Sequence, residues 1–173
     1  MWLLHPRAVP STLPPNAALR NSWHNVPTWK SVPFSPKQST ALEHGGYYYP
    51  TKPNFAVIDS FLFLHSKRPE TIVLVCFQMT VKSHEPTESM LQEFITEFQT
   101  SFHIGGSSPT IAEGEAGGIS ATFGKGKSAT LELHLIYVTT DKDFGYQKLK
   151  HGQQLSTLWS RIQQYRSPPP QAS

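Results

Sequence analysis

The chain has 173 residues, of which 38% are hydrophobic, and this size predicts one domain with one core. Its formal charge of +3 is dispersed along the chain, which allows contact with nucleic acid without requiring it. The lone Cys76 excludes an intrachain disulfide and a thiolate zinc site. No run approaches the roughly 20 apolar residues of a membrane span, and the opening MWLLHPRAVP lacks the apolar core of a secretory signal. We therefore expect an intracellular protein with no membrane partner.

Residues 1–40 are rich in proline. Seven prolines interrupt every helix that could form there, and no alternation of apolar and polar residues lasts long enough for a strand. We expect this arm to be extended or disordered and the α/β domain to span residues 41–165. The C-terminal RSPPPQAS, residues 166–173, is expected to form a proline-rich tail.

Two segments near residues 55–65 and 71–82 are enriched in β-branched and aromatic residues. The turn-like SKRPE joins them, so the pattern predicts a β-hairpin. Asp59 lies inside the first segment, FAVIDSFLF, whose other residues are almost all apolar. A carboxylate in such surroundings is costly unless it is paired, hydrogen-bonded or bound to a metal. Asp59 is therefore either a metal ligand or a strand-end residue bonded to backbone amides.

The second segment, TIVLVCFQMTVK, ends in polar residues at every other position. Side chains alternate along a strand, so Gln78, Thr80 and Lys82 are expected on one face. They are candidates for a catalytic face beside Asp59, or they decorate the solvated face of the sheet.

Apolar residues then recur at helical spacing from Met90 to Phe102, after Pro86, and predict a helix. The glycine- and serine-rich residues 105–128 are expected to be mostly loop, with a short strand near residues 119–123. TLELHLIYVTT predicts a partly buried strand, and Leu155, Leu158, Trp159 and Ile162 predict a second helix.

The stretch ATFGKGKS matches a relaxed phosphate-loop pattern ending in Gly126, Lys127 and Ser128. A phosphate loop must lead into a helix, whereas the residues that follow here are strand-like. We therefore interpret the stretch as a basic hairpin, in which Lys125 and Lys127 could touch a nucleic-acid backbone.

The phrases YYYPTKPNFAVIDSF, VCFQMTVKSH and LHLIYVTTDKDFGYQ occur in this order between about residues 45 and 150. Together they resemble the nuclease-like domain of retrotransposon hot spot proteins and Crinkler-type effectors, a divergent branch of the PD-(D/E)XK restriction-endonuclease-like superfamily. The resemblance implies a mixed central sheet flanked by helices. It also implies Mg²⁺ as a cofactor and nucleic acid as the partner, with DNA favoured over RNA.

In that superfamily an aspartate on one strand lies beside an acid-x-lysine triplet on the next. Asp59 matches the aspartate, Gln78 takes the place of the second acid and Thr80 that of the lysine. Metal binding is implied for Asp59, for Gln78 and for the carbonyl of Met79, while Lys82 is a candidate for a displaced positive charge. An amide brings no negative charge, and Glu43 is a poor match to the upstream helical glutamate of the superfamily.

Three interpretations therefore stay open. In the first, the domain binds nucleic acid and hydrolyses phosphodiesters with Mg²⁺. In the second, it is a catalytically inactive interaction module, related to effectors or derived from a mobile element. A nuclear location accords with the resemblance, although the chain has no dense basic targeting cluster. In the third interpretation, the chain is a truncated copy of such a domain and has no independent function.

Overall fold

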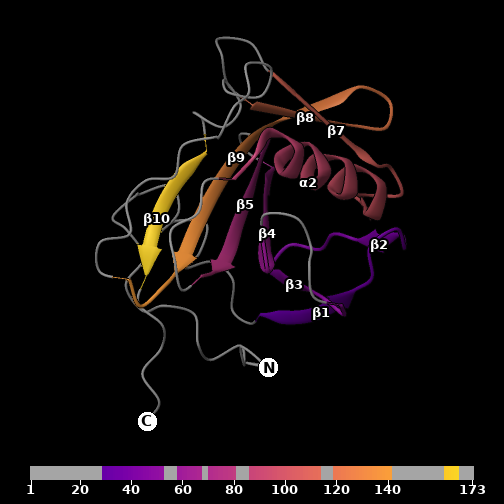
Figure 1. The fold of residues 1–173 in the computed structure, drawn as a ribbon. Helices are drawn as coiled ribbons and strands as arrows, with labels where there is room; N and C mark the ends of the chain where they lie inside the picture. The colour runs from indigo at the N-terminus through magenta and orange to yellow at the C-terminus, as the bar shows by residue number, and fades with distance from the viewer. Residues whose placement is uncertain are drawn as a thin grey trace.

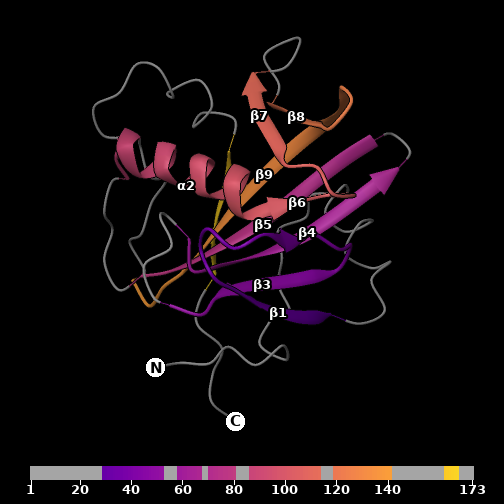
Figure 2. The ribbon, with the colours of Figure 1, turned by 90° about the vertical axis from the view of Figure 1, so that its right-hand side faces the viewer.

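The computed structural model describes residues 29–52, 58–67, 70–80, 86–113, 119–141 and 162–167. In these residues one mixed sheet is covered on one face by helix α2, Glu88–Ser101 (Figures 1 and 2). The strands of the sheet are listed in spatial order. They are β1 (Lys30–Phe34), β3 (Gly46–Pro50), β4 (Ser60–Lys67), β5 (Glu70–Met79), β9 (Lys127–Val138), β8 (Ile119–Phe123) and β7 (Pro109–Glu113), with β10 (Gln163–Ser167) also paired to β9.

The sheet is mixed, and most of its strands run in the same direction. Strands β3, β4 and β5 are successively antiparallel, whereas β1 pairs in parallel with β3, and both β5 and β10 pair in parallel with β9. Strands β1, β3, β5, β9 and β10 therefore all end at one edge of the sheet, where β4 begins. A separate short pair joins β2 (Thr40–Ala41) to β6 (Phe102–His103). Within the described residues, no helix has the length and hydropathy needed to span a membrane.

Several predictions from local pattern are confirmed. The predicted hairpin is β4–β5, with Ser60 opposite Phe77 and Lys67 opposite Glu70. The predicted helix is α2, and its first turn is capped because the Thr87 hydroxyl accepts a hydrogen bond from the Met90 amide. The short strand near residues 119–123 is β8, and β8 and β9 form a hairpin around the GKG turn. The mixed α/β class is therefore as predicted.

Strand β1 contradicts the prediction that residues 1–40 contain no strand. Its backbone pairs with β3, about sixteen positions later, so its stability comes from a distant partner rather than from local alternation. Pro33 is tolerated because β1 is the outer strand, where a missing N–H leaves no ladder bond unmade. Residues 1–28 of the predicted arm lie outside the described residues.

The predictions of loop and helix also fail in two places. Pro109–Glu113, inside the predicted loop, forms β7 by pairing with β8. Most of the second predicted helix lies outside the described residues. Its described residues are not helical, because Ile162 is a bend and the residues from Gln163 onward form β10. β10 also includes the first two residues of the predicted tail. It is fixed to β9 by the parallel ladder and by Tyr165, which stacks on buried His134 at a ring-centroid distance of 5.8 Å.

The core occupies both faces of β5. Ile72, Leu74 and Cys76 face α2 and join a large cluster that includes Leu91 and Phe94. The intervening residues of β5 pack into a smaller cluster on the other face of the sheet, formed by Leu62, Leu64, Val73, Val75, Phe77 and Ile136. Burial of alternate residues on opposite faces explains why this strand reads as a nearly continuous apolar run.

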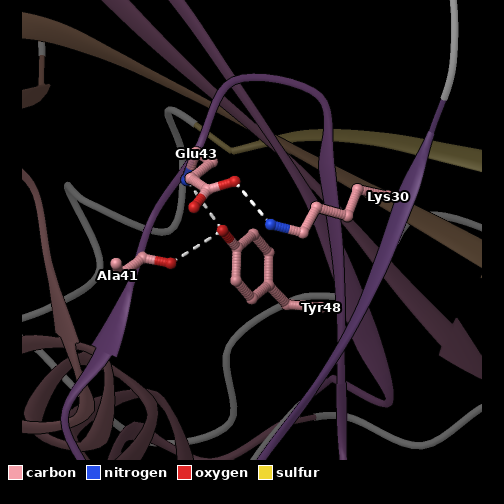
Figure 3. Close-up of polar contacts among 4 residues, drawn as sticks. All are labelled: Lys30, Ala41, Glu43 and Tyr48. Carbon is pink, nitrogen blue, oxygen red and sulfur yellow. Dashed lines mark hydrogen bonds and ion pairs between the residues drawn. The ribbon is translucent and has the colours of Figure 1, made fainter.

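Tyr48 fixes the turn between β2 and β3 (Figure 3). Its side chain is fully buried, and its hydroxyl accepts a hydrogen bond from the Glu43 amide at 2.7 Å and donates one to the Ala41 carbonyl at 2.9 Å. Gly46 is required beneath the ring, because an added Cβ would lie 2.5 Å from Cε2 of Tyr48. The Glu43 side chain pairs instead with Lys30 at 2.8 Å, at the surface (Figure 3).

Replacement of Tyr48 by Phe should lower the free energy of unfolding by about 1–3 kcal/mol, because two backbone groups lose their partner. The matched control is Glu43→Gln, which removes the ion pair but keeps the backbone amide, and should cost less than about 1 kcal/mol. Urea denaturation measures both. Equal costs for the two variants would mean that the Tyr48 hydroxyl does not hold the turn.

Candidate functional site

Polar residues gather at the edge of the sheet where β3, β5 and β9 end. We call this the carboxyl edge and define it by Asp59, Gln78–Thr80 and Thr139–Asp141, together with Thr51 and Lys52 after β3. Asp59 belongs to it because β4 runs opposite to its neighbours and begins where they end. Ligand-binding groups are commonly found at such edges, where strands leave the core.

Asp59 closes the ladder between β4 and β5. Its amide donates a hydrogen bond to the Phe77 carbonyl at 2.8 Å, and the Met79 amide donates one to Asp59 Oδ2 at 2.6 Å. Burial raises the pKa of the Asp59 carboxyl, and the hydrogen bond from Met79 opposes that rise without cancelling it. The carboxylate is thus partly desolvated and has one donor to its Oδ2 atom within the described residues.

Tyr47 approaches the same carboxyl group from β3. Its hydroxyl donates a hydrogen bond to Ser60 Oγ at 2.8 Å. Burial raises the pKa of the Tyr47 hydroxyl, the Ser60 bond lowers it, and the negative charge of Asp59 raises it further. The hydroxyl therefore remains protonated, and its single proton is used in the bond to Ser60, the residue next to Asp59.

The predicted site residues separate into three groups. Asp59 and Met79 are in direct contact, although through the Met79 amide, whereas the resemblance implies a role for the Met79 carbonyl. Gln78 is half-buried at the end of β5, and the Thr80 amide donates a hydrogen bond to the Val138 carbonyl at 3.1 Å, which ties the end of β5 to β9. Lys82 lies outside the described residues.

The donor set for a metal at this edge is limited. No group of three or more His, Cys, Asp or Glu side chains gathers around a common point in the part of the chain that the structure describes. A hard cation at Asp59 would have to complete its shell with amide, hydroxyl, carbonyl or water oxygens, which Mg²⁺ accepts. A Mg²⁺ ion bound by the described residues of this edge would therefore keep several waters instead of entering an all-carboxylate cage.

Sequence reasoning missed Lys52. It is exposed after β3 and forms no hydrogen bond or ion pair with any described residue. The signal that could have found it is the run YYYP, whose aromatic residues have high strand propensity and are followed directly by Thr51 and Lys52. Recognition of that strand would have placed a lysine at the carboxyl edge.

Comparison with known proteins adds no relative. No protein-family model matches the sequence, and neither the curated proteins nor the solved structures contain a match.

Substitutions at Asp59 should separate its charge from its hydrogen bond. Because the pKa of Asp59 is raised in the folded state, its ionisation makes folding less favourable as pH rises from its ordinary value of 3.8 through the raised value. Asp59→Asn keeps an acceptor for Met79 without the buried charge, so it should be at least as stable as wild type at pH 7. Asp59→Ala should lose about 1–3 kcal/mol.

Urea denaturation of the three proteins at pH 7 and below pH 3.8 measures this difference, and the gap between wild type and Asp59→Asn should shrink in acid. Equal destabilisation by Asn and by Ala at pH 7 would mean that the negative charge itself holds the edge together.

Proposed function

We propose that this chain is a divergent PD-(D/E)XK-type, nuclease-like domain that engages nucleic acid and hydrolyses phosphodiesters with Mg²⁺. The observation that supports it best is the contact between Asp59, directly before β4, and Met79, at the end of β5. This contact sets Asp59 beside the middle residue of the triplet Gln78–Thr80, and the resemblance implies an aspartate next to such a triplet.

The form of the sheet also supports the proposal. The central strands are mixed in direction, since β5 is antiparallel to β4 and parallel to β9. Helix α2 lies in the connection between β5 and β9 and packs on one face (Figure 2). A mixed central sheet with a flanking helix is what the resemblance implies.

Each residue at the edge would have a separate task. Asp59 supplies the negative charge that binds the cation, and the Gln78 side chain and the Met79 carbonyl supply neutral oxygens. Thr80 or Lys82 orients water or a phosphate oxygen. Bound Mg²⁺ would polarise the phosphate and stabilise the charge that develops on it. Burial raises the pKa of Asp59, so this carboxylate becomes protonated at a higher pH than an exposed aspartate does. As the pH falls, the site should therefore lose its cation affinity sooner.

Metal binding and cleavage should both depend on the charge of Asp59. We expect heat of Mg²⁺ or Mn²⁺ binding by calorimetry, and metal-dependent nicking of supercoiled plasmid, from wild type. Both should fall to background in Asp59→Asn, which retains the fold if the stability prediction above holds. Lys127→Gln, at the opposite end of β9, is the matched control and should keep metal binding. Undiminished nicking by Asp59→Asn would remove Asp59 from the mechanism.

A second candidate function is a non-catalytic interaction module. It is favoured by the use of Asp59 Oδ2 as an acceptor for a backbone amide, which gives this residue a structural task. It is also favoured by the neutral residues Gln78 and Thr80 at the acid and lysine positions of the triplet. Nucleic-acid binding by wild type without metal-dependent cleavage would support this alternative.

A further inference from the structure

Strands β1 and β3 present an open row of residues on the face of the sheet opposite α2. Val32 and Tyr48 point to the cluster under α2, so their neighbours in each strand point the other way. These neighbours are Ser31, Pro33, Tyr47 and Tyr49, which we call the tyrosine face. Ser31 pairs in register with Tyr47, and Pro33 with Tyr49.

The tyrosine face is accessible. Ser31 and Pro33 are exposed, and Tyr47 and Tyr49 are each partly exposed. Tyr47 packs against the smaller cluster, which anchors the row to the core, while Tyr49 lies farther along β3 toward the carboxyl edge.

The ring of Tyr47 is held in place, and the ring of Tyr49 lies beside it. Their centroids are 6.4 Å apart, and the Tyr47 ring also meets Phe77 edge-on at 6.1 Å. The hydrogen bond from Tyr47 to Ser60 Oγ restrains the ring further. A flat ligand that stacks on rings already in place loses little side-chain entropy on binding.

A positively charged residue, Lys52, lies shortly after Tyr49 in the chain. Lys52 comes three residues after Tyr49, so at most about 11 Å of extended chain separates the two Cα atoms. Lys52 is exposed and has no partner among the described residues, so its charge is available to an anion. Proteins that bind single-stranded nucleic acid combine aromatic rings, on which bases stack, with nearby cations that contact phosphate.

We propose that the tyrosine face, with Lys52, binds the unpaired bases of a single-stranded nucleic acid and leads the strand to the carboxyl edge. This inference rests on the proposed function, and it specifies that the nucleic acid bound is single-stranded. Tyr47 links the two surfaces, since its hydroxyl is bound to Ser60, the residue next to Asp59. A duplex would be bound less well, because its stacked base pairs do not expose their faces to protein side chains.

The test is fluorescence anisotropy with a labelled oligothymidylate and with a duplex of the same length, in EDTA so that cleavage is not required. Wild type should bind the single strand more tightly than the duplex. Tyr49→Leu keeps apolar bulk but removes the ring, and should weaken single-strand binding about 5-fold to 150-fold. Lys52→Gln should reduce the slope of log affinity against log salt by about 0.7.

The matched control lies at the other end of the sheet. Phe123→Leu changes a partly buried ring in β8 and should leave binding unchanged. Unchanged affinity in Tyr49→Leu, an equal loss in Phe123→Leu, or an unchanged salt slope in Lys52→Gln would overturn the proposal. Preference for the duplex, or no binding to either probe, would also overturn it.

The results also separate this inference from the function on which it rests. Single-strand binding that depends on Tyr49, from a protein that never nicks plasmid, supports the tyrosine face and rejects the hydrolysis. Metal-dependent nicking that needs Asp59, from a protein in which Tyr49→Leu binds normally, supports the hydrolysis and rejects the tyrosine face.

Discussion

Burial of β5 on both faces and both edges is the constraint on which the rest of the structure depends. Ile72–Phe77 are all buried, alternately against α2 and against the smaller cluster, while β4 and β9 take up the backbone hydrogen bonds on either side. Full burial of each large apolar side chain is worth about 1.5–3 kcal/mol, so this strand is a main source of stability. A one-residue slip would turn every side chain to the wrong face, so the register is fixed. The end of β5, and with it the contact between Met79 and Asp59, is therefore fixed too.

The placement of polar chemistry follows from that burial. A strand covered on both faces cannot hold a polar side chain without a partner, so polar groups occur where the strand leaves the core. Gln78 is the first residue of β5 after the buried run, and Asp59 precedes the buried residues of β4. Asp59 also satisfies the Met79 amide, so one carboxyl group serves the fold and is the candidate for the chemistry. A cation at this site would have to share the carboxylate with a backbone hydrogen bond.

The two faces of the sheet have different surroundings: one is covered by a helix, and part of the other is accessible to solvent. Helix α2 covers one face with residues such as Leu91 and Phe98, which leaves that side to packing. The opposite face becomes accessible over β1 and β3, where Tyr47 packs against the core and the ring of Tyr49 lies beside that of Tyr47. Partly exposed rings that are already in place would need little reorganisation to bind a flat ligand. Tyr47 is bonded to Ser60, which is next to Asp59, so the proposed binding surface and the proposed chemistry would be adjacent.

The sequence by itself determined the parts that depend on neighbours in the chain. The apolar run of β5, its hairpin with β4 and the helical spacing of Leu91, Phe94 and Phe98 all express local periodicity, and Asp59 was conspicuous as a charge in an apolar segment. Tertiary structure alone decided β1, β7 and β10, because these short strands are stabilised by backbone bonds to distant partners rather than by their own pattern. It also decided that Asp59 bonds to the Met79 amide and that Lys52 lies at the carboxyl edge. Pairing across a sheet depends on which strands meet, and a one-dimensional pattern does not contain that information.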